Sequence, residues 1–128
     1  MLINQLSVFM ENKEGRLEQV LETLKEGNIN INSLSLAETT DYGLLRMIVS
    51  DPEAGKNALK EKGFSAMLTP VLAVDVADEV GQLQVVLTKI TQAGINIEYV
   101  YSMKAGGDGA TIIIRTSDLA KTEEVLSV

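Results

Sequence analysis

The stretch GRLEQVLETLKEGNINI, from Gly15 to Ile31, returns 66 residues later as GQLQVVLTKITQAGINI, from Gly81 to Ile97. The same spacing separates outlying residues, since Gly43 recurs as Gly109. A period this long indicates two folded units, because solenoid repeats are about 20–50 residues long. The constant spacing predicts that no insertion or deletion separates the two copies.

Each copy predicts the same order of elements, βαββαβ. In the first copy, Leu17, Val20, Leu21 and Leu24 follow the i, i+3, i+4, i+7 spacing of a helix with one apolar face. Asp51 is a natural N-cap and Pro52 suits the first helical position, so a second helix is expected to run to about residue 62. Gly27-Asn28 is expected to end the first helix, and strands are expected at residues 6–10, 28–36, 44–49 and 64–69.

The second copy repeats this pattern with strands expected at residues 71–76, 95–103 and 111–115, and a hairpin tip at residues 106–109. Ser117 is expected to cap a last helix that runs to about residue 126. This copy has no fourth strand after that helix. In the repeat, residues 1–4 occupy the place of the strand that closes the first copy. They either close the sheet of the second copy or merely lengthen the first strand, and the domains are expected at residues 1–68 and 69–128.

The composition excludes several classes of protein. The formal net charge of −7 disfavours nucleic acids and anionic membrane surfaces as partners. The absence of cysteine and histidine removes thiolate chemistry, disulfides and the commonest acid–base group near neutral pH. The first residues do not resemble a signal peptide, and no apolar run reaches the length of a membrane span. We therefore expect a cytoplasmic protein without a metal or cofactor.

Each copy resembles an ACT domain, the small regulatory module of enzymes of amino-acid metabolism. The motif is a polar loop that ends in Gly-x-Leu, an amphipathic helix and a Gly-Ile-Asn-Ile-like entry to the second strand, and Glu14 and Val80 stand where the family often has proline. The resemblance covers essentially the whole chain. The two copies are similar in arrangement to the paired regulatory domains of aspartate kinases. It implies an α+β fold of two ferredoxin-like units in tandem, each an antiparallel sheet with helices on one face.

The resemblance also implies an amino-acid site at an ACT–ACT interface, between the loop of one domain and the second strand of its neighbour. Gly15 and Gly81 each stand where a strand turns into a helix, so backbone N–H groups at the positive end of the helix dipole can receive a carboxylate. The amine then needs acceptors on the second strand. The candidate ligand-binding residues are Asn12, Lys13, Glu14, Gly15, Arg16, Leu17, Asn30, Ile31 and Asn32 in the first copy, and Asp78, Glu79, Val80, Gly81, Gln82, Leu83, Asn96, Ile97 and Glu98 in the second.

Two classes of function remain open alongside this prediction. The first is a non-catalytic sensor that binds a free amino acid and acts on an enzyme of amino-acid biosynthesis in trans. The alternative is a homodimeric interaction or scaffold protein that needs no ligand and covers the open face of its sheet. An enzyme is not expected, because no pair of carboxylates, lysines, tyrosines or hydroxyls has a spacing that supports catalysis. Charges in the loops are either ligand contacts or a solvated rim.

Overall fold

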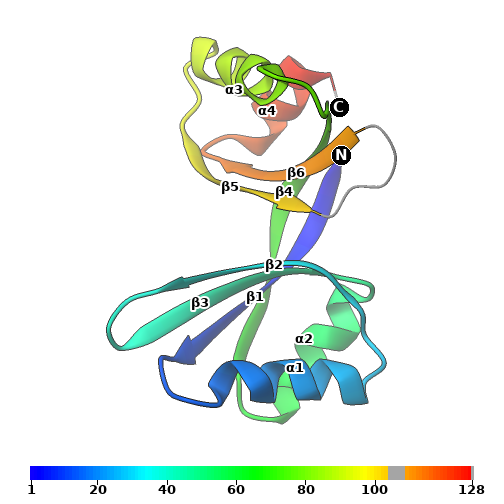
Figure 1. The fold of residues 1–128 in the computed structure, drawn as a ribbon, viewed down its shortest axis with the longest axis vertical. Helices are drawn as coiled ribbons and strands as arrows, with labels where there is room; N and C mark the ends of the chain where they lie inside the picture. Colours follow the sequence, from blue (N-terminus) through cyan, green and yellow to red (C-terminus); the bar gives the residue numbers. More distant parts are fainter. Residues whose placement is uncertain (104–108, 128) are drawn as a thin grey trace. The chain divides into compact units, whose positions relative to one another are not determined.

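The computed structural model describes residues 1–103 and 109–127, and the chain divides into two compact units. The first unit is Asn4–Thr69, and the second unit joins Met1–Ile3 to Pro70–Val128. Figure 1 shows the elements of both. The predicted hairpin tip at residues 106–108 lies outside the described residues.

The first unit has the predicted βαββαβ order. Its strands follow the order β2-β3-β1-β4 in the sheet, and both helices cover the same face of that sheet (Figure 1). The pairs β1–β3 and β2–β3 are antiparallel. The elements are β1 (Leu2–Glu11), α1 (Arg16–Glu26), β2 (Ile31–Glu38), β3 (Tyr42–Val49), α2 (Pro52–Glu61) and the first part of β4 (Ser65–Ala77).

The second unit repeats the architecture with the order β4-β6-β5, again antiparallel, and with its helices on one face (Figure 1). The predicted ferredoxin-like fold is thus confirmed. Its remaining elements are α3 (Gln82–Gln92), β5 (Ile97–Met103), β6 (Gly109–Thr116) and α4 (Leu119–Leu126).

Alternating strand residues and the apolar faces of the helices form the two cores. In α1, Val20 and Leu24 of the predicted stripe are fully buried, and Leu17 packs against the same cluster. In the second unit Ile90 is fully buried, while Val86 and Leu87 are only partly buried. The apolar periodicity therefore predicted the buried face of α1, whereas in α3 the first residue of the expected apolar face, Leu83, is exposed.

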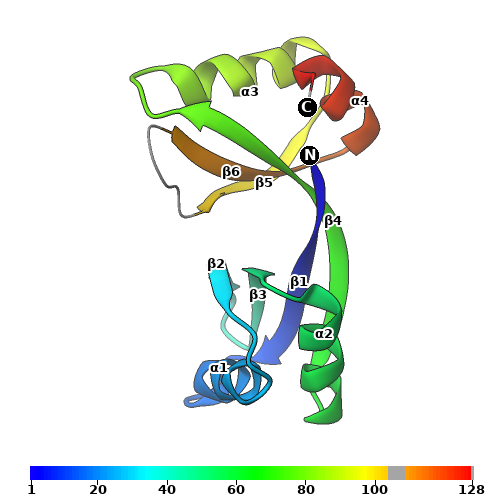
Figure 2. The same ribbon diagram turned by 90° about the vertical axis from the view of Figure 1, so that its right-hand side faces the viewer.

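One strand replaces the two that were expected at residues 64–69 and 71–76. Strand β4 has 13 residues and passes through Pro70. Figure 2 shows it as one uninterrupted strand. Proline has no N–H to donate, but its carbonyl still accepts, and Arg115 Nη1 donates to Pro70 O at 2.5 Å. Strand β4 therefore contributes residues to both units.

The strand registers reveal one inserted residue in the second copy. Leu6 pairs with Met47, and Leu72, which lies 66 residues after Leu6, pairs with Ile114, which lies 67 residues after Met47. Since β2 and β5 keep the spacing of 66, the extra residue lies in the connection between β5 and β6. The expectation that the copies differ by no insertion was wrong.

This insertion also moves the cap of the last helix. With a spacing of 66, Asp51 corresponds to Ser117, but the structural counterpart is Asp118. Asp51 Oδ1 accepts from Ala54 N at 3.1 Å, and Asp118 Oδ1 accepts from Lys121 N at 3.0 Å. The predicted cap at Asp51 is therefore confirmed, whereas the cap predicted at Ser117 was wrong. Ser117 Oγ instead accepts from Asn96 N at 3.1 Å.

The N-terminal residues pair with β4. Met1 N donates to Ala73 O at 3.1 Å, and Ala73 N donates to Met1 O at 2.8 Å. Whether residues 1–4 are needed to complete the second sheet, and where the two domains divide, stay predictions that truncation can test.

Candidate functional site

In each unit one glycine directly precedes the first helix, and these two glycines have nearly the same backbone angles. Gly15 has φ 85° and Gly81 has φ 83°, both in the left-handed region that other residues enter at a cost. A methyl group built at either glycine would meet no atom within 4 Å. The backbone at these two helix starts is therefore open to the approach of a small molecule.

The N-terminal caps of α1 and α3 differ from those of α2 and α4. Within the described residues, no side chain caps the N-terminus of α1 or α3. Asp51 and Asp118 cap α2 and α4. The first N–H groups of a helix have no intrahelical acceptor, and the helix dipole makes this end positive. The two predicted loops thus offer uncapped helix ends that suit a carboxylate.

Several side chains of the first loop are engaged within the unit. Asn12 Nδ2 donates to Thr39 O at 3.1 Å and to Thr40 O at 3.3 Å, so Asn12 ties the loop to the β2–β3 hairpin. Leu17 packs against the core, and Glu14 is exposed. Asn12 and Leu17 therefore support the shape of the loop, while Gly15 presents its backbone.

Glu11, which the sequence did not single out, sets the charge of the first loop. Its carboxylate lies 2.8 Å from Lys13 Nζ and 3.9 Å from Arg16 Nη2. The hydrogen bond from Lys13, together with the charge of its ammonium, lowers the pKa of Glu11 below its ordinary value. Arg16 Nη1 also donates to Gln19 Oε1 at 3.1 Å. Glu11 therefore offsets one of the two positive charges that Lys13 and Arg16 bring to the first loop.

The second loop has fewer contacts of this kind. Asp78, Glu79 and Val80 are exposed, and the backbone turns through hydrogen bonds from Glu79 N to Ala77 O and from Gln82 N to Glu79 O. Gln82 replaces Arg16, and Leu83 is exposed where Leu17 is partly buried. The two loops share a backbone but differ in charge.

The predicted residues of the second strands form a separate group at the other end of the first helix. Asn30 Nδ2 donates to Asn32 Oδ1 at 2.8 Å, and Asn30 N donates to Ser50 Oγ at 2.9 Å. In the second unit Glu98 Oε1 lies 3.5 Å from Arg115 Nε. Ile31 and Ile97 pack against the cores, whereas the side chains of Asn30 and Asn96 are exposed.

The first unit does not bring its own loop and its own Asn30 together. The loop borders a small cavity with Leu36 and Glu38, near the end of β2, whereas Asn30 borders a depression with Leu21 and Lys25. The 11 residues of α1 separate these places by about 16 Å at 1.5 Å per residue. The first unit therefore does not bring both groups within reach of one amino-acid-sized molecule.

Other kinds of site find no support. In the described part of the chain, no group of three or more Asp, Glu, His or Cys residues is arranged to hold a metal ion. None of the described helices has the length and apolar character needed to cross a membrane.

A family model for an ACT domain pair matches residues 1–128. The chain belongs to the ACT domain family. This family assignment confirms the resemblance that the two glycine loops indicated. Comparison with the curated proteins finds no match.

Solved structures share this ACT domain pair. Protein BT0572 from Bacteroides thetaiotaomicron is 42% identical with a TM-score of 0.93, over 99% of this chain and 88% of that chain. The ligand-free regulatory subunit of aspartate kinase from Thermus thermophilus is 16% identical with a TM-score of 0.71, over 99% of this chain and 91% of that chain. The corresponding subunit from Thermus flavus is 17% identical with a TM-score of 0.68, over 98% and 90%. At these lower identities, the two subunits show that the fold is shared.

Proposed function

We propose that this ACT domain pair is a non-catalytic regulatory protein that binds a free amino acid. The ligand lies between the loop before the first helix of one ACT domain and the second strand of a neighbouring domain. The observation that carries this proposal is the pair of uncapped helix N-termini, each led by a left-handed glycine with open space around it. The family and the shared fold of aspartate kinase regulatory subunits support it.

The two halves of an amino acid find different partners in this arrangement. The carboxylate accepts hydrogen bonds from N–H groups of the first helical turn beyond Arg16 N and Gln82 N, which already donate to Lys13 O and Glu79 O, and the helix dipole favours negative charge there. The ammonium is received by the exposed side chains at the start of a second strand, which are Asn30 and Asn32 in one domain and Asn96 and Glu98 in the other.

Binding regulates only if the amino acid stabilises one arrangement of the domains over another. We propose that the affected arrangement controls contact with an enzyme of amino-acid metabolism that acts in trans, that the protein works as a homodimer, and that it resides in the cytoplasm. The family model that matches the chain describes an ACT domain pair, and a regulatory role needs no catalytic residues.

A thermal-shift screen of the twenty amino acids tests the proposal. A hundredfold excess of ligand over its dissociation constant stabilises the folded protein by about 2.7 kcal/mol. We expect Gly15→Ala or Gly81→Ala to abolish the response, because the added methyl occupies the approach to the helix end.

Two other glycines provide matched controls. Gly63 has φ 88° and Gly94 has φ 77°, each with open space, but both follow the end of a helix rather than precede its start. Gly63→Ala and Gly94→Ala should incur the same backbone cost, about 1–2 kcal/mol, and keep the response. A protein that responds to none of the twenty amino acids would instead fit the ligand-independent scaffold.

A further inference from the structure

The outer side of α3, the first helix of the second unit, is almost free of charge. Lys89 is its one charged residue, whereas α1 has five charged residues over the same length. The α1 charges on the side away from the core have uncharged, exposed counterparts in α3 at the spacing of 66. These pairs are Glu18 and Gln84, Glu22 and Thr88, Lys25 and Thr91, and Glu26 and Gln92.

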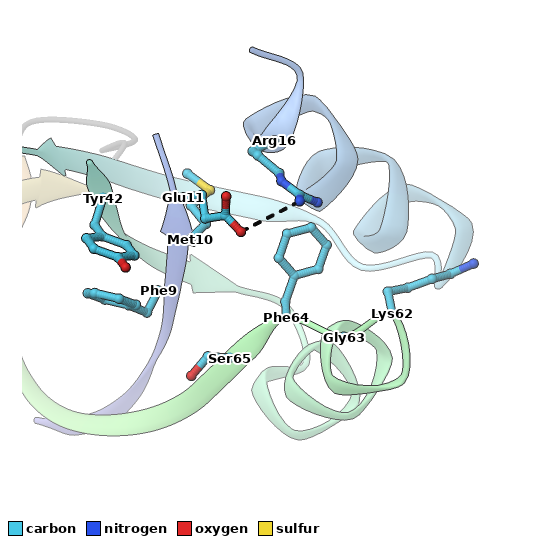
Figure 3. A pocket seen from close by; sticks show the side chains of 9 residues that line it. All are labelled: Phe9, Met10, Glu11, Arg16, Tyr42, Lys62, Gly63, Phe64 and Ser65. Atoms are coloured by element: carbon cyan, nitrogen blue, oxygen red, sulfur yellow. Dashed lines mark ion pairs between the residues drawn. The ribbon is translucent and has the colours of Figure 1, made fainter. Parts of the chain in front are cut away.

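The start of each helix shows the same contrast. At the start of α1, Arg16 reaches toward Glu11, with Nη2 and the carboxylate 3.9 Å apart (Figure 3). The counterparts of these two residues are Gln82 and Ala77, which carry no charge. The same position in the same fold therefore presents charges in the first unit and neutral side chains in the second.

Apolar side chains are exposed around α3. They are Val80, Leu83 and Val85. Their counterparts in the first unit are the polar residues Glu14 and Gln19 and the partly buried Leu17. Since exposed helix faces are ordinarily polar or charged, apolar surface in this place indicates contact with another molecule.

A groove of about 530 Å³ runs along this side of α3, and we call it the α3 groove. Its described lining residues all belong to α3 or are Gly81, and none of them is charged. Two rows of side chains at a spacing of four border it, Leu83-Leu87-Thr91 and Gln84-Thr88-Gln92. Such rows are the ridges that interdigitate when two helices pack. The α3 groove therefore has the form of a helix-packing surface.

The polar groups along the α3 groove can be covered without loss of hydrogen bonds. Thr91 Oγ1 donates to Leu87 O at 3.0 Å, so its hydroxyl already has an acceptor within the helix. The amides of Gln84 and Gln92 both donate and accept, and the hydroxyl of Thr88 does the same. Side chains of this kind can pair with identical side chains.

Charge favours a second copy of this chain as the occupant. Two copies with a net charge of −7 repel each other wherever their acidic surfaces meet. In a dimer with twofold symmetry, each surface patch meets the same patch of the partner. Glu18, Glu22 and Glu26 of α1 would then face glutamates, whereas the α3 groove would face neutral side chains.

We infer that the α3 groove is a self-association surface, on which α3 of a second copy packs. The ridges of each helix lie in the groove of the other, which is the packing that crosses helices at about −50°. This surface supplies the contact for the proposed homodimer and rests on that part of the proposed function. It needs no amino acid, and it uses neither of the edge strands β2 and β5.

Sedimentation velocity of the full chain over a range of concentrations, without amino acids, tests this surface. We expect a dimer that dissociates on dilution. Thr88→Glu installs the residue of the first unit and should raise the dimer dissociation constant by about a hundredfold or more, because like charges then face each other. Gln84→Glu, which keeps the shape of the side chain, should weaken the dimer in the same direction.

A matched control adds the same charge elsewhere. Asn57 is exposed in the middle of α2, so Asn57→Glu should leave the dissociation constant unchanged. Circular dichroism and thermal unfolding confirm that each variant is folded. A mixture of Thr88→Glu with Thr88→Lys should form dimers again, because each glutamate then meets a lysine.

The outcomes separate this surface from the rest of the proposed function. A wild-type protein that stays monomeric at millimolar concentration would overturn both the α3 contact and the proposed homodimer. A dimer that both glutamate variants leave intact would overturn the α3 contact alone, since the copies would then meet elsewhere. A mixture that stays monomeric although both variants are folded would show that α3 does not pack on itself.

Discussion

The two units share a fold, but the residues that join the second helix to the sheet differ between them. In the first unit Gly55 lets α2 approach closely, since a methyl there would come 2.9 Å from Leu6 Cδ2. In the second unit Thr122 replaces it, at the spacing of 67, and its hydroxyl lies 2.7 Å from that of buried Thr116. The same backbone thus accepts either an apolar contact or a satisfied hydrogen bond.

Because the two units differ at many positions, the backbone geometry that they share is informative. Core contacts and loop charges change between the copies, yet Gly15 and Gly81 keep φ 85° and φ 83° at uncapped helix ends. Features that vary serve one unit, whereas the shared glycine bend serves the function that we propose for both.

The largest difference between the units should appear in their cores. Leu59 is fully buried, whereas its counterpart Leu126 is only partly buried against its cluster. Leu59→Ala should cost about 2–5 kcal/mol of unfolding free energy, because it leaves a cavity. Leu126→Ala should cost clearly less. Urea unfolding of the two variants measures this, and equal losses would show that the second core is packed as tightly as the first.

The N-terminal residues should matter more to the second unit than to the first. A chain without residues 1–3, begun by Asn4→Met, loses the two hydrogen bonds between Met1 and Ala73. At roughly 0.5–1.5 kcal/mol each, this predicts a loss of about 1–3 kcal/mol. Hydrogen exchange should then increase mainly in residues 70–127. A uniform increase across both units would contradict the prediction that residues 1–4 close the sheet of the second copy.

The buried threonine pair should behave as a hydrogen bond rather than as packing. Thr122→Val keeps the shape but takes a hydrogen-bond partner from the Thr116 hydroxyl, which predicts a cost of about 1–2 kcal/mol. Thr122→Ser keeps the hydroxyl and removes one methyl, and should cost about 0.8 kcal/mol. Thermal unfolding ranks the two variants. A valine variant as stable as wild type would mean that the hydrogen bond of Thr122 does not stabilise this contact, which would then be as apolar as that at Gly55.

The smallest effect concerns Glu11, whose counterpart Ala77 cannot titrate. Because Lys13 lowers the pKa of Glu11 in the folded state, its contribution is present above the unfolded pKa and is lost as the pH falls through the folded pKa. An NMR titration of the Glu11 carboxyl should give a midpoint below that of an ordinary glutamate. Lys13→Ala should raise that midpoint, and no change would mean that Lys13 is not the cause.

The local signals in the sequence predicted most of the fold. Asp51 and Pro52 marked the start of α2, and the spacing of Val20 and Leu24 marked the buried face of α1, because caps and helix periodicity act within a few residues. The cap at Ser117 was wrong because matching Gly43 to Gly109 hid the inserted residue. Only the strand pairing, which is set by distant hydrogen bonds, revealed it.

The site was less predictable for the same reason. Gly15 and Gly81 were found because a glycine between a strand and a helix is a local signal. Phe9 and Tyr42 lie far apart in the sequence, and only the pairing of β1 with β3 brings their rings together, with centroids 5.1 Å apart. The ion pairs of Glu11 likewise depend on where β1 ends relative to α1.

Amide NMR of the full chain in the presence of each of the twenty amino acids tests the central claim most directly. The account predicts that at least one amino acid shifts the amide signals of Gly15 or Gly81 and the residues that follow it, while Gly63 and Gly94 stay in place. If no amino acid moves either helix-start glycine, or if all four glycines shift alike, the uncapped helix ends do not bind the ligand and the regulatory account is contradicted.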